Sequence, residues 1–120
     1  MPPEEKDPGL VWDIVRYART VVEMASDRSF DDFLADDQFR LASERCIELI
    51  GEAAAHLSAP FRQRSPHIPW AHIVGLRNII VHGYAQLDHA KLWSVVKNDV
   101  PQLLNELSPV VEDADDPPAC

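Results

Sequence analysis

Four polar residues interrupt an apolar stretch in the second half of the chain and could act together on a phosphate. They are Arg77, Asn78, His82 and Tyr84, within the segment Leu76-Arg-Asn-Ile-Ile-Val-His-Gly-Tyr84. An imidazole can exchange a proton near neutral pH, and a guanidinium can hold two non-bridging phosphate oxygens and stabilise the charge that develops on them. This combination suits work on a phosphodiester, and such chemistry requires no metal ion.

These side chains can meet only if the chain turns after His82. At about 100° per residue, Arg77 and His82 lie about 140° apart around a helix. A glycine directly after the last residue of an apolar pattern is the usual left-handed helix terminator, because it has no β-carbon to oppose a positive φ. If Gly83 ends the helix in this way, Tyr84 can fold back toward His82, and Arg77 can reach both.

A purely structural explanation of the same residues stays open. An Arg-x4-His spacing often arises by chance, so His82 could cap or pack a helix end while Arg77 pairs with an acid such as Glu52. Glu52 could orient Arg77 across two helices, or it could be a solvated carboxylate on a helix surface. Asp88 is the only acid in residues 60–91, so the clustered carboxylates of a two-metal nuclease are missing there and we expect no metal site.

The sequence around these residues predicts an all-α fold. Glycine is scarce, with 4 in 120 residues, and apolar residues recur at spacings of three and four rather than in alternation. Four long helices with short connections and one additional short helix favour an up-and-down four-helix bundle. The long helices are expected at about residues 8–26, 36–58, 69–82 and 88–107, with the short one near 30–34.

Prolines mark the limits of this helical pattern and one interruption within it. Asp7 before Pro8 predicts an N-cap followed by the first turn of a helix, and Pro101 lies inside the last pattern and should kink it. The chain after Pro109 is acidic and rich in proline, a composition that does not pack into a core. We therefore expect a helical bundle over residues 1–108 and a flexible tail over residues 109–120.

Composition and charge narrow the function classes. Hydrophobic residues make up 46% and charged residues 26%, as in globular proteins, and no apolar run approaches the ~18 residues of a membrane span. The N-terminus has no signal-peptide pattern, and Cys46 and Cys120 outline neither a disulfide framework nor a metal site. We expect a cytoplasmic protein with no membrane association and no cofactor.

The formal net charge of −9 argues against nonspecific binding of nucleic acid, because an acidic surface repels a polyphosphate. Residues 60–91 are the exception, with four basic side chains against one acid and four of the five histidines. The segment that carries Arg77 and His82 is therefore the one cationic part of the chain.

The motif and its surroundings resemble the HepT toxins, a branch of the HEPN superfamily of small helical ribonucleases. Arg77-Asn-Ile-Ile-Val-His-Gly-Tyr84 is similar to the Arg-x4-His-x-Tyr motif of that family. Glu48-Leu-Ile-Gly-Glu-Ala-Ala54 resembles its Ile-Gly-Glu-Ala signature, and Ile68-Pro-Trp70 resembles its Ile-Pro-Trp. The resemblance covers roughly residues 8–107, and several motifs in a fixed order are more specific than any one of them.

The resemblance implies an HEPN-like homodimer with two motifs facing each other across a cleft that cleaves RNA, with tRNA among the candidate substrates. Arg77 and His82 would be catalytic, and we interpret Asn78 and Glu52 as supporting residues. It also implies the toxin of a type VII-like toxin–antitoxin pair. The antitoxin would be an MntA-like minimal nucleotidyltransferase that transfers AMP from ATP to Tyr84, so ATP would be used by the partner.

The physical logic of this scheme is coherent, and one alternative remains. AMP on Tyr84 would place bulk and negative charge where RNA phosphate binds. A symmetric dimer would supply two copies of His82, one as base and one as acid.

The alternative is a noncatalytic HEPN dimer that binds RNA or serves as the protein partner of a nucleotidyltransferase. Intact Arg77 and His82 favour the enzyme, whereas the acidic total favours the alternative.

Overall fold

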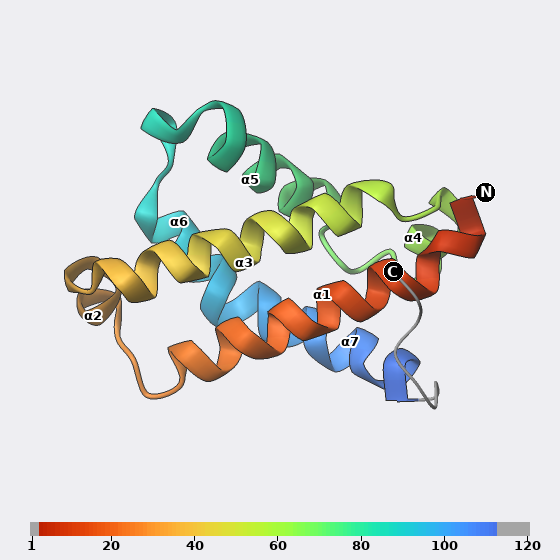
Figure 1. Cartoon of the computed structure of the whole chain (residues 1–120), viewed down its shortest axis with the longest axis horizontal. Helices are drawn as coiled ribbons and strands as arrows, with labels where there is room; N and C mark the ends of the chain where they lie inside the picture. Colours follow the sequence, from red (N-terminus) through yellow and green to blue (C-terminus); the bar gives the residue numbers. More distant parts are fainter. Residues whose placement is uncertain (1–2, 113–120) are drawn as a thin grey trace.

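The computed structural model describes residues 3–112, and the regular structure in that range is entirely helical, with no strand (Figure 1). The predicted all-α class is therefore confirmed. The elements in chain order are α1 (Pro3–Ala25), α2 (Phe30–Ala35), α3 (Asp37–His56), α4 (Ala59–Gln63), α5 (Trp70–His82), the 3₁₀ turn η1 (Tyr84–Gln86), α6 (His89–Ser94), the π-helical turn η2 (Val95–Asp99) and α7 (Val100–Glu112).

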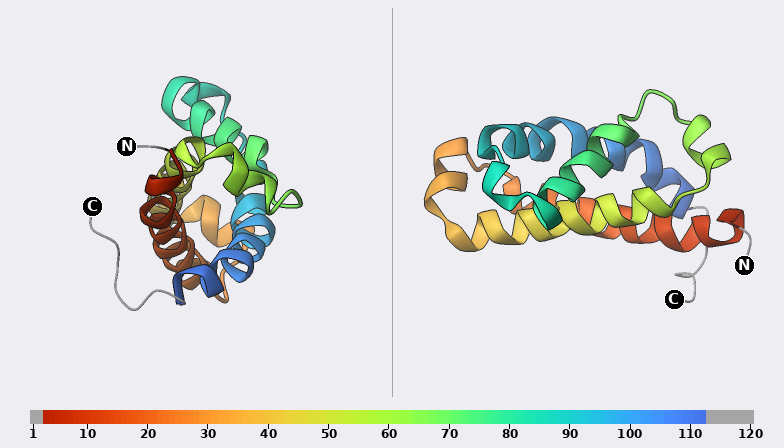
Figure 2. Two further views of the ribbon diagram at one scale, coloured as in Figure 1. Left: turned by 90° about the vertical axis from the view of Figure 1, so that its right-hand side faces the viewer. Right: turned by 90° about the horizontal axis from the view of Figure 1, so that it is seen from above.

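Successive long helices run in alternate directions, and α3 lies at the centre of the arrangement. It packs against α1 on one side and α5 on the other, and α1 in turn packs against α7. Figures 1 and 2 show α5 on the far side of α3 from α7. The extensive contacts of α5 are with α3, so much of its outer face is left without a neighbour.

The core forms between α1, α3 and the segment from α6 to α7, with an aromatic cluster at one end. The Phe33 ring centroid lies 5.5 Å from that of Phe39 and 5.1 Å from that of Trp93, which joins α2, α3 and α6. Trp93 therefore fills space in the bundle. No helix within residues 3–112 is both long and apolar enough to cross a bilayer.

The expected cap at Asp7 is wrong. Helix α1 begins at Pro3 and contains Pro8, and the Asp7 carboxylate is buried, where it accepts hydrogen bonds from the Ser58 backbone N–H (2.9 Å) and the Ser58 hydroxyl (2.6 Å). Proline inside a helix removes one backbone donor and crowds the carbonyl four residues earlier. Asp7 links α1 to the start of α4, and no local pattern reveals a partner so distant in sequence.

The last helical segment contains a π turn directly before Pro101. The Val100 N–H donates to the Val95 carbonyl, five residues earlier rather than four. Pro101 has no N–H, and its ring crowds the preceding turn, so the wider π turn makes room for the ring. This turn is the irregularity that the sequence predicts at Pro101. Helix α7 then continues through Pro109 to Glu112, so residues 109–112 of the expected tail are helical. The rest of that tail, residues 113–120, lies outside the described residues.

Candidate active site

Arg77 lies where α5 crosses α3 most closely. A β-carbon added to Gly51 would overlap the Arg77 β-carbon and lie 3.1 Å from the Ile73 carbonyl oxygen. Glycine within a helix is about 1 kcal/mol less favourable than alanine. The close approach of the two helices explains why this position in α3 is a glycine, and it places the start of the Arg77 side chain on the surface of α3.

The Arg77 guanidinium is held by two polar neighbours. Its Nη2 pairs with the Glu52 carboxylate of α3, and its Nη1 donates to Asn78 Oδ1 at 2.9 Å. The Arg77 Nε is buried and makes no hydrogen bond. The Glu52 side chain remains 46% exposed, so this ion pair faces solvent at a place that a phosphate can reach.

Tyr84 makes a separate contact with α3, in the turn that follows α5. Its hydroxyl donates to Glu44 Oε1 at 2.7 Å, and only 6% of the Glu44 side chain is exposed. The other carboxylate oxygen, Glu44 Oε2, is buried without a hydrogen bond and lies 3.9 Å from Arg40 Nε. The hydrogen bond to Glu44 raises the pKa of Tyr84 above the ordinary value of 10.0, because it stabilises the protonated phenol.

The structure does not bring Arg77 and Tyr84 together within one chain. They contact Glu52 and Glu44, which are eight residues apart and therefore about 12 Å apart along the axis of α3. The expectation that Arg77 reaches Tyr84 fails because each of these two side chains binds its own carboxylate on α3, and no hydrogen bond within residues 3–112 joins Arg77 to His82. Gly83 does end α5, but with φ −136° it is not left-handed, and the chain continues into the turn η1.

His82 is the last residue of α5, and its side chain is exposed. Among residues 3–112, none makes a hydrogen bond or an ion pair with it. In the chain it lies between Arg77 and Tyr84, five residues after the arginine. The imidazole is therefore open to a substrate or to a second protein chain.

Comparisons with known proteins agree with the motif. A family model described as "Ribonuclease HepT-like" matches residues 14–110, which include every site residue named above. The chain belongs to the HepT-like ribonuclease family. It is 38% identical over 97 residues to a protein of Methanocaldococcus jannaschii named as a candidate RNase, which covers 81% of this chain and 89% of that one.

A second relative is named "probable ribonuclease HepT" and comes from Thermococcus cleftensis. It is 34% identical to this chain over 91 residues, which is 76% of this chain and 83% of the relative. No solved structure matches the chain significantly. The family assignment therefore rests on sequence, and the HepT-like helical fold described above is consistent with it.

One residue at the site of this HepT-like chain, Glu44, was missed by sequence reasoning. Glu44, Glu48 and Glu52 are spaced four residues apart, which places them along one side of α3, and this pattern was the available signal. Glu52 pairs with Arg77 and Glu44 with Tyr84, whereas Glu48 accepts a hydrogen bond from Arg45 at 3.0 Å. Two of the three glutamates therefore anchor motif residues.

Helix α5 exposes two large apolar side chains, on different sides of the helix. Ile79 is 38% exposed and Val81 is 40% exposed, and both lie within five residues of Arg77. A helix that is apolar on most of its sides is usually buried on most of them. Helix α5 packs extensively against α3 alone, so the side of α5 that carries Ile79 has no neighbour within the described residues.

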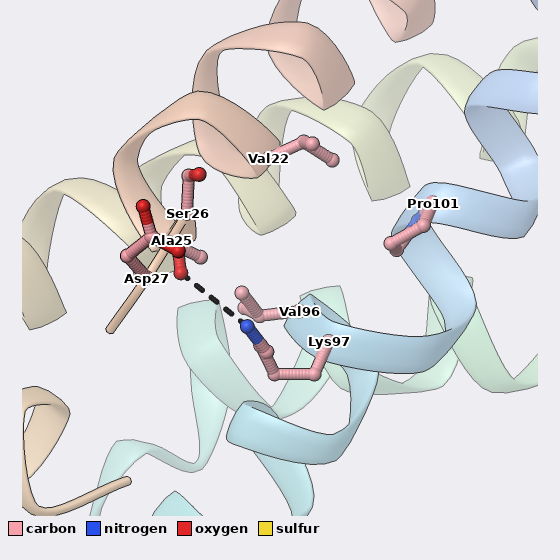
Figure 3. A pocket seen from close by; sticks show the side chains of 7 residues that line it. All are labelled: Val22, Ala25, Ser26, Asp27, Val96, Lys97 and Pro101. Atoms are coloured by element: carbon pink, nitrogen blue, oxygen red, sulfur yellow. Dashed lines mark hydrogen bonds between the residues drawn. The ribbon is translucent and has the colours of Figure 1, made fainter. Parts of the chain in front are cut away.

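Two further features lie away from these residues. A small hollow between the end of α1 and the start of α7 is lined by Val22, Asp27 and Lys97 among others, and by no residue of the motif (Figure 3). The Lys97 ammonium donates to the Ala25 carbonyl at 3.4 Å, as suits a cation at a helix C-terminus. Within residues 3–112, no group of three or more His, Cys, Asp or Glu residues is arranged to hold a metal ion.

Proposed function

We propose that this HepT-like chain is the ribonuclease toxin of a toxin–antitoxin pair and that it cleaves RNA at a cleft shared by two copies. The observation that carries this proposal is an exposed, unengaged His82 on the same helix as an arginine that Glu52 and Asn78 hold in place. This arrangement supplies a group that moves protons and a group that binds phosphate. Transfer RNA is one candidate substrate.

Cleavage would proceed by attack of a ribose 2′-hydroxyl on the adjacent phosphate, with release of the 5′-oxygen and without a metal ion. One His82 takes the 2′-hydroxyl proton, and the His82 of the second copy gives a proton to the leaving oxygen. Arg77 stabilises the negative charge on the phosphorane. Asn78 and Glu52 orient the guanidinium, and RNA phosphate competes with the exposed Glu52 carboxylate for part of it.

A homodimer would supply the second histidine. The exposed apolar side chains Ile79 and Val81 of α5, a helix that packs extensively on α3 alone, support association through this helix. His82 lies at the end of the same helix, so a two-fold contact centred near the C-terminal end of α5 would bring the two imidazoles toward one cleft. The acid–base scheme thus depends on the contact between the two copies.

An MntA-like nucleotidyltransferase would silence the enzyme by transferring AMP from ATP to Tyr84. The Tyr84 side chain is 49% exposed, so a partner protein can reach it. The added phosphodiester brings negative charge and bulk to the segment directly after His82, where RNA phosphate would bind. Intact mass spectrometry after mixing with the partner and ATP tests this step, since AMP that persists in Tyr84→Phe excludes Tyr84 as the acceptor.

The central experiment is RNA cleavage in EDTA by purified wild type, His82→Ala and His72→Ala. His72 is an exposed histidine on the same helix and serves as the matched control. We expect cleavage of total RNA or tRNA by wild type and by His72→Ala, and none by His82→Ala. If wild type cleaves no RNA, the nuclease proposal is wrong. If His82→Ala cleaves at the wild-type rate, the role of His82 is wrong.

A second candidate function is favoured by the net charge of −9. A noncatalytic HEPN dimer that binds RNA, or that serves mainly as the protein partner of a nucleotidyltransferase, needs less cationic surface than an enzyme acting on RNA. Under this function the wild type would leave RNA intact while binding it or accepting AMP. The same EDTA assay, with a gel-shift lane beside it, separates the two functions.

A further inference from the structure

Glu44 is a buried carboxylate that touches the hydroxyl oxygen of Tyr84. We propose that Glu44 is the general base that removes the proton from this hydroxyl when Tyr84 is modified. The proposal rests on the AMP transfer proposed above, and it adds a residue of this chain to the chemistry of that transfer. It identifies Glu44 as a catalytic residue because Glu44 contacts the reacting oxygen itself.

The geometry suits proton transfer. The 2.7 Å distance from Tyr84 Oη to Glu44 Oε1 is a short, charge-assisted hydrogen bond that already points the proton at the carboxylate. The phenol is fully protonated near neutral pH, since this hydrogen bond raises its pKa above 10.0. The nucleophile is therefore the neutral hydroxyl, and a base must take the proton as the new bond forms.

The step balances without any further reactant beyond the nucleoside triphosphate. Tyr84 Oη bonds to the α-phosphorus, the bond between that phosphorus and the oxygen bridging to the β-phosphate breaks, and pyrophosphate leaves. The Tyr84 proton passes to Glu44 Oε1. The products on the chain are a tyrosyl phosphodiester and a protonated Glu44.

The charges at the site favour this direction of transfer. Before the reaction a buried carboxylate carries one negative charge, and its Oε2 has no hydrogen bond. Afterwards Glu44 is neutral and the negative charge lies on the phosphodiester, which is closer to solvent. Proton uptake by Glu44 moves the negative charge from a side chain that is 6% exposed and lies 3.9 Å from Arg40 Nε to a group nearer the surface. It also removes the like-charge repulsion that an ionised Glu44 would exert on the added phosphate.

The competing explanation is that Glu44 only holds the turn η1 in place through the hydrogen bond. Glu44→Gln separates the two explanations, because the glutamine carbonyl oxygen accepts the same hydrogen bond but cannot take up the proton. Glu48→Gln is the matched control, since Glu48 lies one turn further along α3 and binds Arg45 instead. Circular dichroism establishes that both variants fold.

The test uses an arylsulfonyl fluoride, which modifies a tyrosine hydroxyl by the same kind of displacement with fluoride as the leaving group, and needs no partner protein. Peptide mapping follows the modification of Tyr84, and Tyr17, the other tyrosine of the chain, serves as internal reference. We expect Tyr84 to react faster than Tyr17, Glu44→Gln to slow Tyr84 by at least about tenfold, and Glu48→Gln to leave it unchanged. Equal rates at Tyr84 in wild type and Glu44→Gln would overturn the proposal.

The pH dependence of the wild-type reaction gives a second measurement that needs no variant. Direct reaction of the phenolate makes the rate rise about tenfold per pH unit below the pKa of Tyr84, whereas transfer of the proton to a base within the step needs no prior phenolate, so we expect a smaller rise. A tenfold rise per unit in the wild type would exclude Glu44 as the base. Absence of AMP transfer from a nucleotidyltransferase would contradict the proposed function alone, because the sulfonyl fluoride reaction is independent of that partner.

Discussion

Gly51 of α3 lies directly against the side chain of Arg77 on α5, and no side chain fits between the two helices at this point. The approach of these helices brings the arginine within reach of Glu52. The small residue in α3 thus sets the position of the Arg77 guanidinium on another helix.

Replacement of Gly51 tests this relationship. Gly51→Ala puts a β-carbon where Arg77 Cβ lies, so we expect the free energy of unfolding to fall by about 1–3 kcal/mol and RNA cleavage to fall with it. Gly9→Ala in α1 is the control, because a β-carbon there meets nothing within 4 Å. Urea denaturation of both variants measures the difference, and equal stability would contradict the close packing.

Changes at Arg77 and Glu52 test how the guanidinium is held. Arg77→Lys keeps the charge but loses the planar fork that contacts Glu52 and Asn78, so we expect the cleavage rate to fall by about a hundredfold or more with little change in stability. Glu52→Gln should give a smaller loss, because one acceptor oxygen remains. Single-turnover cleavage of a labelled RNA measures both, and a fully active Arg77→Lys would remove Arg77 from the mechanism.

Mixed dimers test whether two copies share one cleft. A dimer of one wild-type subunit and one His82→Ala subunit, purified through two different tags, should cleave RNA at least about a hundredfold more slowly than wild type, because either the base or the acid is missing. The comparison is made per dimer. A mixed dimer that cleaves at the wild-type rate would show that one His82 suffices.

The outer face of α5 gives a prediction about assembly. Ile79→Asp replaces an exposed apolar side chain on the side of α5 away from α3 by a charge, and we expect it to shift the chain toward monomer in sedimentation experiments and to reduce cleavage. Val110→Asp on α7 is the matched control, since Val110 is 46% exposed and lies on a helix at the far side of α3 from α5. If both variants sediment like wild type, association does not involve α5.

The Tyr84–Glu44 contact gives a prediction about pH. Because the folded-state pKa of Tyr84 is raised, the contact contributes its full stability below the ordinary value of 10.0 and loses it as pH rises through the folded-state value. In a Tyr17→Phe background, where Tyr84 alone gives the tyrosinate absorbance, Glu44→Gln should lower the titration midpoint. An unchanged titration midpoint would mean that the Tyr84 hydroxyl does not donate a hydrogen bond to Glu44 in solution.

The sequence by itself determined the helical class, most helix ends and the motif residues, since these depend on local spacing. Apolar residues at helical intervals predict α3 and α5, and Gly83 marks the end of α5 by its position alone. The resemblance to the HepT family also rests on short motifs in a fixed order, which the sequence shows directly. The sequence was misleading at Asp7, which does not cap a helix. Its carboxylate instead accepts hydrogen bonds from Ser58, 51 residues away.

Only the tertiary structure decided which carboxylate each motif residue binds. Glu44 and Tyr84 are 40 residues apart in the chain, and Glu52 reaches Arg77 only because α5 packs on α3 across Gly51. The sequence could offer Glu52 as one of two possibilities and did not indicate Glu44 at all. Such pairings depend on how closely and in which direction two helices cross, and that is set by the packing of the whole bundle rather than by any segment of it.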